Sequence, residues 1–241
     1  MDLQTKCKKL RLGSIYEIYP TIDYKDKEQY LSELFQVELD KRRDKKIGQM
    51  IKKARFFNPK TFDSYDWNLV KLPTTITKED IMNLEFVKKK ENLLLIGAVG
   101  TGKTHLATAI GIQACMYNLK VRFYQCADLV NLLLVRYKSS GLDKLMKELA
   151  KLDLLVLDEL GFVPFHRDGS ELLFNIIASC YERNSVIVTS NLQFGEWNTV
   201  FGDNRLTSAI IDRLIHHAHI MTFTGESYRL RNALSANILK K

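Results

Sequence analysis

The stretch that decides the fold is Asn-Leu-Leu-Leu-Ile-Gly-Ala-Val-Gly-Thr-Gly-Lys-Thr, residues 92–104. Its first six residues are mostly apolar, which is typical of a short buried strand. The remainder matches G-x-x-x-x-G-K-[ST], and residues 106–116 then follow helical apolar spacing. A strand, a glycine loop and a helix in this order predict a phosphate-binding loop, because backbone N–H groups and the helix N-terminus converge on phosphate oxygens.

We expect this loop to bind ATP together with Mg²⁺. Lys103 would reach the β- and γ-phosphates, and the Thr104 hydroxyl would ligate Mg²⁺. A glycine-rich turn without a function is the alternative, and the surrounding strand and helix argue against it. The residues expected to bind the nucleotide here are Gly97, Ala98, Val99, Gly100, Thr101, Gly102, Lys103, Thr104 and His105.

A second apolar run, at residues 153–159, ends in the acidic pair Asp158 and Glu159. Ligands of open α/β sheets bind at the carboxyl ends of the strands. Asp158 is therefore expected to hold Mg²⁺, directly or through water, and Glu159 to polarise the attacking water. Many strands end in an acid, so this motif gains its weight from its position 55 residues after Lys103.

Three more strands are predicted, at residues 121–124, 185–191 and 219–223, which gives five in all. The second of these ends in Asn191, whose amide would hydrogen-bond the γ-phosphate or the attacking water. Strands that alternate with helices imply a parallel sheet, so the predicted fold class is α/β. The pairing of Asp158 with Glu159 fits an enzyme that hydrolyses ATP to ADP and phosphate better than a metabolic kinase.

The positive charge of the chain is concentrated in one stretch. The 241 residues carry a net charge of +8, and residues 41–60, with nine basic residues and one acid, account for all of it. One face of a predicted helix over 27–56 collects Arg42, Lys45, Lys46 and Lys53, apart from an apolar face. Charge alone leaves a solvated face and nucleic-acid binding equally open, whereas the apolar face is too modest for a membrane surface.

Asn58-Pro59 is expected to end this helix, because the residue before a proline avoids the helical region. We place a domain boundary there, with a small all-α basic domain at 1–58 and the α/β core at 59–241. At the start of the core, Phe62, Tyr65 and Trp67 would either cover the adenine base or pack the linker onto the sheet.

The sequence predicts a cytoplasmic protein without a membrane segment. The first ten residues hold four charges, which argues against a secretory leader. The longest apolar stretches, about seven residues, fall short of the ~20 residues that a membrane-spanning helix needs. The four cysteines are far apart and form no C-x-x-C pair, so neither a zinc knuckle nor a disulfide framework is expected.

The motifs together resemble AAA+ ATPases of the DnaC/IstB group, and most closely its IstB-like members, from Leu10 to about Arg231. The phosphate-binding loop is generic to the wider superfamily. The specific string runs from Phe201 to Leu230 and includes Asp212-Arg213-Leu214 and Gly225-Glu226-Ser227-Tyr228-Arg229. The 18 residues after the last strand leave no room for a separate C-terminal helical lid, which agrees with IstB-like cores.

The resemblance implies roles for two arginines. Arg213 lines up with the arginine finger that relatives present to a neighbouring subunit's ATP, and Arg205 is its rival. A surface contact between Arg213 and Asp212 is the alternative. Arg229 is a candidate phosphate sensor within its own subunit.

The resemblance also implies a function and partners. We expect a homo-oligomer with ATP at its subunit interfaces, which binds double-stranded DNA with little sequence specificity and serves a cognate transposase in insertion-sequence transposition. In initiator-type relatives an extra helix in the segment 127–151 lines a DNA channel, which makes Lys138 a candidate contact. The alternative is a DnaC-like replicative helicase loader, and a metabolic kinase ranks third.

His216, His217 and His219 lie at a predicted helix-to-strand junction. Asp212 is the nearest carboxylate at ligand spacing, and no cysteine accompanies them. We therefore expect a structural role, or one at the edge of the nucleotide, and Mg²⁺ bound with ATP is the one metal that the sequence predicts.

Overall fold

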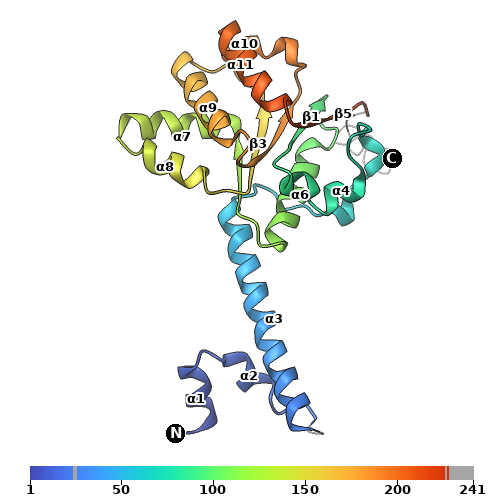
Figure 1. The fold of residues 1–241 in the computed structure, drawn as a ribbon, viewed down its shortest axis with the longest axis vertical. Coiled ribbons are helices and arrows are strands. Elements are labelled where there is room, and N and C mark those ends of the chain that lie inside the picture. Colours follow the sequence, from blue (N-terminus) through green and yellow to red (C-terminus); the bar gives the residue numbers. More distant parts are fainter. Residues whose placement is uncertain (24–25, 226, 228–241) are drawn as a thin grey trace, which may run out of the picture. The chain divides into compact units, whose positions relative to one another are not determined.

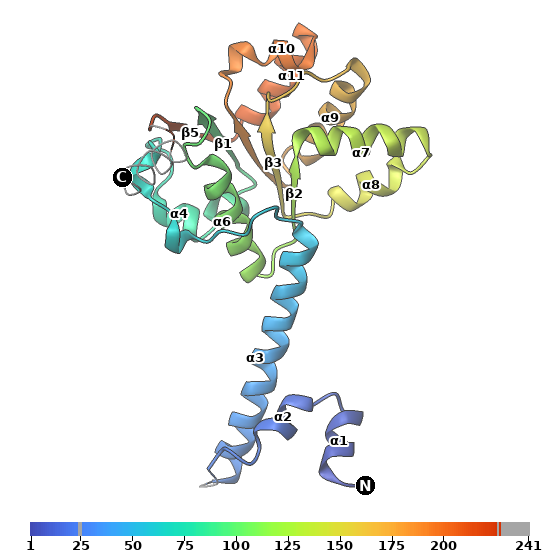
Figure 2. The ribbon, with the colours of Figure 1, turned by 180° about the vertical axis from the view of Figure 1, so that it is seen from behind.

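The structure is a computed structural model that describes residues 1–23, 26–225 and 227 (Figures 1 and 2). The chain divides into two compact units, Met1–Met50 and Ile51–Lys241. The division falls within helix α3 (Lys27–Ala54), upstream of the boundary predicted after residue 58. Across the described ranges, no helix combines the length and the apolar character that a membrane crossing requires.

Helices are the only regular elements among the described residues of the first unit. Helices α1 (Leu3–Lys9) and α2 (Gly13–Ile18) pack with α3 around a small core of Cys7, Ile15 and Leu34. Asp2 caps α1 by accepting a hydrogen bond from the N–H of Thr5 at 2.8 Å. The helical N-terminal region expected from the sequence is therefore present.

Helix α3 ends at Ala54, four residues before the predicted Asn58-Pro59. Arg55 has a φ of 66°, the left-handed conformation that commonly ends a helix. Phe56 then packs edge-on against Phe123, with ring centroids 5.9 Å apart. The proline restrains only the residue before it, whereas the helix ends where Phe56 turns into the core of the second unit.

The second unit is built on a five-stranded sheet, and the predicted strands are confirmed. The strands are β1 (Asn92–Gly97), β2 (Val121–Gln125), β3 (Leu154–Leu160), β4 (Ser185–Ser190) and β5 (Ala218–Phe223). Their order is β2-β3-β4-β1-β5, and all neighbouring pairs are parallel. Strand β4 thus lies between the strand that enters the glycine loop and the strand that ends in acids.

Helices cover both faces of this sheet (Figures 1 and 2). On one face α6 (Lys103–Met116) crosses β1 to β4. On the other face α7 (Cys126–Lys138), α9 (Arg167–Cys180) and α11 (Asn204–Ile215) pack on inward-facing Leu94, Leu155 and Val186. The shorter helices are α4 (Lys78–Met82), α5 (Glu85–Lys88), α8 (Leu142–Leu149) and α10 (Asn198–Phe201), with 3₁₀ turns η1 (Phe62–Ser64), η2 (Trp67–Leu69) and η3 (Phe194–Glu196).

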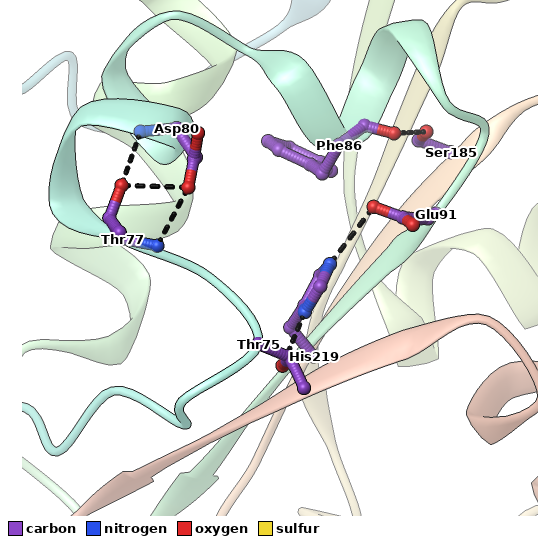
Figure 3. A network of polar contacts seen from close by, with 7 residues as sticks. All are labelled: Thr75, Thr77, Asp80, Phe86, Glu91, Ser185 and His219. Carbon is purple, nitrogen blue, oxygen red and sulfur yellow. Dashed lines mark hydrogen bonds and ion pairs between the residues drawn. The ribbon is translucent and has the colours of Figure 1, made fainter.

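His219 ties the edge strand β5 to the chain that precedes β1 (Figure 3). Its Nδ1 lies 2.8 Å from the hydroxyl of Thr75, and its Nε2 lies 3.0 Å from Glu91 Oε2. In the same region the Ser185 hydroxyl donates to the carbonyl of Phe86 at 3.4 Å. The side chain of His219 is buried, so this histidine has a structural role.

Asn92, at the start of β1, fastens three elements together. Its Oδ1 accepts a hydrogen bond from the N–H of Val186 in β4 at 2.9 Å. Its Nδ2 donates to the carbonyl of Leu214 in α11 at 3.0 Å. Asn92 is 8% exposed, so water does not replace these partners readily. Asn92 therefore fixes the amino ends of the central strands.

Replacing the Asn92 side chain tests how much it contributes to stability. Asn92→Ala should lower the free energy of unfolding by about 2–4 kcal/mol, because it leaves the buried N–H of Val186 and the carbonyl of Leu214 unpaired. Denaturant unfolding measures the loss. Asn131→Ala, on an exposed position of α7, is the control and should change stability by less than about 0.5 kcal/mol. Equal effects of the two substitutions would contradict the role of Asn92.

Candidate functional site

The loop between β1 and α6 turns at three glycines in the left-handed region. Gly97, Gly100 and Gly102 have φ values of 153°, 83° and 99°. A Cβ at Gly97 would overlap the backbone of Phe223 at the end of β5. Gly102 is the N-cap of α6, so the helix N-terminus opens directly onto the loop. This arrangement aims backbone N–H groups and the positive end of the helix dipole at one point.

Lys103, the first residue of α6, is buried and turns back into the loop. Its Nζ donates to the carbonyl of Gly97 at 2.6 Å and to that of Ala98 at 2.7 Å. Lys103 is only 8% exposed. The ammonium charge is therefore held within the concave side of the loop.

Asp158 and Thr104 meet beside this lysine. Asp158 Oδ1 accepts hydrogen bonds from the hydroxyls of Thr104 at 2.9 Å and Thr189 at 2.5 Å. Burial raises the pKa of the Asp158 carboxyl, while the two hydroxyls and the charge of Lys103 act in the opposite direction. A carboxylate and a hydroxyl are the hard oxygen donors that Mg²⁺ prefers, so this pair fits the predicted metal ligands.

Thr189 links the two acidic residues and was missed as a site residue by the sequence reasoning. Besides donating to Asp158, its Oγ1 accepts the N–H of Glu159 at 2.9 Å. Glu159 has a φ of 59°, in the left-handed region that a non-glycine residue rarely occupies. Thr189 comes two residues before Asn191, and only the position of β4 beside β3 reveals its partners.

A cavity of about 420 Å³ opens beside these residues. Lys103, Thr104, Asp158 and Glu159 line it, so residues from both predicted motifs face the same cavity. The linker before the core and strand β2 supply much of the remaining wall. The other lining residues are Phe57, Asn58, Lys60, Ser64, Tyr65, Asp66, Leu69, Gly100, Gly102, His105, Thr108, Phe123 and Gln125.

Tyr65 is the linker aromatic that reaches this cavity. Its ring meets that of His105 edge-on, with ring centroids 5.2 Å apart. Phe62 and Trp67 stack on each other with ring centroids 5.8 Å apart, and neither lines the cavity. The Tyr65 hydroxyl is buried and has no hydrogen-bond partner within the described part of the chain. Burial raises the pKa of this phenol, so it remains a neutral donor.

His105 is fixed by the same linker. Its Nε2 lies 3.0 Å from the carbonyl oxygen of Thr61, which accepts only, so Nε2 carries the proton. Burial lowers the pKa of His105, and the hydrogen bond to Thr61 works against that shift. The imidazole is thereby oriented between the linker and the glycine loop.

The remaining predicted residues lie around the site in different ways. Asn191 is exposed and follows β4 immediately, without lining the cavity. Arg213 is half-buried, with its guanidinium 4.7 Å from the centroid of the Phe174 ring and a hydrogen bond to the carbonyl of Ala209 at 3.1 Å. Arg205 is exposed. Arg229 lies outside the described residues.

Ser227, which is described, lies close to the glycine loop. Ser227 lies against Gly100, where a Cβ would overlap its hydroxyl oxygen. The position of Gly100 in the loop therefore requires glycine for two reasons, its φ and this close neighbour.

The residues predicted to contact DNA differ in their surroundings. Arg42 donates to Glu38 Oε1 at 2.8 Å and to the carbonyl of Arg11 at 2.6 Å. Glu38 is buried, so part of the Arg42 charge is neutralised by its own unit. The other predicted contacts are also exposed: Lys45, Lys46 and Lys53 on α3, and Lys138 at the end of α7.

Comparison with protein families gives a match over nearly the whole chain. The model of the family described as IstB-like ATP binding protein matches residues 5–236. The ATP-binding protein of insertion sequence IS232 from Bacillus thuringiensis is 35% identical over 85% of this chain and 82% of its own. Those of IS5376 from Geobacillus stearothermophilus and IS21 from Pseudomonas aeruginosa are 36% and 33% identical, over 81% and 80% of their own lengths.

Solved structures share the fold at lower identity. The DnaC helicase loader aligns with a TM-score of 0.54 and 20% identity, over 70% of this chain and 99% of its own. The replication initiator DnaA bound to AMPPCP and single-stranded DNA aligns with a TM-score of 0.55 and 19% identity, over 75% of this chain and 56% of its own. The predicted fold class, a P-loop AAA+ core with a five-stranded parallel sheet, is confirmed.

The burial of Asp158 leads to a prediction about stability. Asp158→Asn should stabilise the nucleotide-free protein at neutral pH by about 1 kcal/mol, because an amide needs no compensation for buried charge and its oxygen still accepts from both threonines. Thermal unfolding measures the difference. Asp44→Asn, which neutralises an exposed carboxylate, should change stability by less than about 0.5 kcal/mol.

The stability difference between Asp158→Asn and the wild type should change with pH in a defined direction. The Asp158 carboxyl has a raised pKa in the folded protein, so ionisation weakens the folded state above that pKa. The advantage of Asp158→Asn should therefore be present at neutral pH and shrink as the pH falls through the folded-state pKa of Asp158. An advantage that grows on acidification would contradict the burial of this carboxylate.

Proposed function

The chain belongs to the family of IstB-like ATP-binding proteins, and on this basis we propose that it is an Mg²⁺-dependent ATPase that assembles on DNA and assists a transposase in insertion-sequence transposition. The contact of Thr104 with buried Asp158, next to Lys103 at the start of α6, is the observation that carries the ATPase proposal. The insertion-sequence relatives, at 33–36% identity, support the role in transposition.

In this proposal the glycine loop, from Gly97 to His105, binds the phosphates of ATP. Lys103 exchanges its bonds to two loop carbonyls for the β- and γ-phosphate oxygens. Thr104 and Asp158 would hold Mg²⁺, which offsets phosphate charge when bound. The Tyr65 hydroxyl, buried without a partner within the described residues, would gain one from the base or ribose of the nucleotide.

Glu159 is proposed as the general base for hydrolysis. Its carboxylate would accept a proton from water as the water oxygen attacks the γ-phosphorus and the bond to the β–γ bridging oxygen breaks, which releases ADP. The hydrogen bond from its N–H to Thr189 fixes the backbone from which this side chain extends into the cavity. Asn191, which directly follows β4, would orient the γ-phosphate or the same water.

Glu159→Gln separates binding from chemistry. The variant should bind ATP as the wild type does and hydrolyse it at least about 100-fold more slowly, because the amide cannot accept the proton. ADP release and nucleotide retention measure the two steps. Glu148→Gln, at an exposed position of α8, should hydrolyse ATP normally. Unchanged turnover in Glu159→Gln would remove Glu159 from the mechanism.

Arg213 is proposed to act on the ATP of a neighbouring subunit. The described residues that line the cavity include no arginine, and Arg213 lies instead over Phe174. A guanidinium contributed by another copy would offset the charge that develops on the γ-phosphoryl oxygens. Because ATP would then join two subunits, nucleotide binding and assembly on DNA would strengthen each other. Arg229 remains a candidate sensor within the same subunit.

Mixing two inactive variants tests this arrangement. Arg213→Ala alone should lose about 10³-fold in turnover or more, as removal of an arginine finger does. Combined with Glu159→Gln subunits, it should recover activity, because some interfaces then pair an intact Glu159 with an intact Arg213. Arg205→Ala is the matched control and should remain active by itself. A mixture no more active than its components would contradict the finger.

The proposed DNA contacts are electrostatic. Lys45 and Lys46 lie exposed on α3, in the stretch 41–60 that carries the excess charge of the chain, and Lys53 and Lys138 are further candidates. Arg42 is a weaker candidate than the sequence alone indicated, because Glu38 accepts a hydrogen bond from it. Contacts of this kind bind phosphates with little sequence readout.

Neutralising two of these lysines tests the contacts. Lys45→Gln with Lys46→Gln should weaken binding to random duplex DNA and reduce the slope of log K against log salt by about 0.9 for each phosphate contact removed. Lys88→Gln, which removes a charge already paired with Glu85 on α5, should leave the slope unchanged. An unchanged slope in the double variant would place the DNA elsewhere.

A DnaC-like helicase loader is the second candidate, because the fold aligns with 99% of the DnaC chain. The insertion-sequence relatives favour the transposition role, since their identity of 33–36% exceeds the 20% shared with DnaC. Binding of the purified protein to the transposase encoded beside it, or to the replicative helicase of the same cell, distinguishes the two.

A further inference from the structure

A second polar cluster lies at the amino ends of β4 and β5, opposite the strand ends that carry the glycine loop. Glu182 lies between α9 and β4, and His216 and His217 lie between α11 and β5. One ligand atom from each side chain lies within 4.8 Å of the other two, and His217 Nε2 is 3.7 Å from Glu182 Oε1. All three residues are exposed, so an ion from solvent has access to them.

The side chains of this cluster are oriented by their surroundings. Glu182 has a φ of 58°, in the left-handed region that glutamate rarely adopts. The Tyr181 hydroxyl lies 2.8 Å from Nδ1 of His216, and the rings of His216 and His217 pack edge-on with centroids 4.2 Å apart. Contacts of this kind fix the ring orientation of histidines that ligate metals.

The donor set selects one class of ion. Two imidazoles and a carboxylate form common protein ligand sets for Zn²⁺, whereas Mg²⁺ and Ca²⁺ prefer oxygen alone. Bond lengths of about 2.0–2.2 Å in tetrahedral geometry place neighbouring ligand atoms roughly 3.3–3.6 Å apart. The distance of 3.7 Å between His217 Nε2 and Glu182 Oε1 is close to this value, and the other pairs of ligand atoms lie within 4.8 Å.

We propose that Glu182, His216 and His217 bind a divalent transition-metal ion, with Zn²⁺ as the best fit and a fourth position open to water. None of the three lines the cavity beside the glycine loop, so this site is separate from the nucleotide site. The ion would join the end of α9 to the end of α11. These packed helices carry Phe174 and Arg213, so the metal would stabilise the pair that positions the proposed finger.

This proposal departs from the expectation of a structural role, or one at the edge of the nucleotide, for His216 and His217. In the sequence, Asp212 is the nearest carboxylate to His216 and His217. In the structure, Glu182 reaches them from 34 residues upstream, because the turn before β4 lies beside the turn before β5. His219 is excluded from the cluster, since its two ring nitrogens contact Thr75 and Glu91.

Metal titration of the untagged, nucleotide-free protein tests the proposal. Co²⁺ should bind with one ion per chain and give the visible absorption of a tetrahedral complex, and Zn²⁺ should displace it. Glu182→Gln, His216→Ala and His217→Ala should each weaken binding at least tenfold. His166→Ala and Glu148→Gln, at exposed positions outside the cluster, should bind as the wild type does.

The controls distinguish a site from a surface ion pair. Thermal unfolding of the metal-free variants checks that they fold, and ATP binding should match that of the wild type because the nucleotide site is untouched. Absence of stoichiometric binding in the wild type would overturn the proposal, and would leave Glu182 and His217 as an ion pair only. Binding that survives all three ligand substitutions would overturn it as well.

Discussion

The burial of the Asp158 carboxylate is the constraint on which the rest of the core depends. A carboxylate that is 2% exposed is unfavourable unless fixed donors replace its water. Thr104 and Thr189 supply these donors from α6 and β4, while Asp158 itself comes from β3. One charged group thus joins three elements that are distant in the sequence. It also leaves an oxygen-rich position where a nucleotide-bound cation would find ligands.

Strand β4 connects Asp158 of β3 with Asn92 of β1 through hydrogen bonds at its two ends. Its carboxyl end supplies Thr189, and near its amino end the N–H of Val186 is bound by Asn92 of β1. The strand order β2-β3-β4-β1-β5 therefore holds the glycine loop and the acidic strand at a fixed spacing. The candidate nucleotide site is destabilised by its buried charge, and the hydrogen-bonded polar groups around the central strands offset that cost.

The sequence was most informative where the determinants are contiguous. The strand at 92–97, the glycine loop and the acidic strand were predicted because each is a short pattern with its own physical signature. Contacts between residues that are distant in the sequence could not be predicted in this way. Thr189 beside Asp158, Tyr65 in the cavity wall and Glu182 near His217 all depend on which strands and turns lie side by side.

The end of helix α3 shows the same limit. Asn58-Pro59 is a valid local signal, yet the helix stops at Ala54 because Phe56 packs against Phe123. A tertiary contact overrides a local preference there. In the same way, the charge pattern found the basic stretch, but not that Arg42 donates to buried Glu38, which lowers its value as a DNA contact.

The most direct measurement is equilibrium binding of ATP, with Mg²⁺, to the wild type and to Lys103→Ala. The arrangement of Lys103, Thr104 and Asp158 predicts that the wild type binds ATP. It also predicts that the alanine variant, shown to be folded by its thermal transition, binds at least about 100-fold more weakly, which corresponds to about 2.7 kcal/mol. Equal ATP binding by the two folded proteins would contradict the assignment of this site.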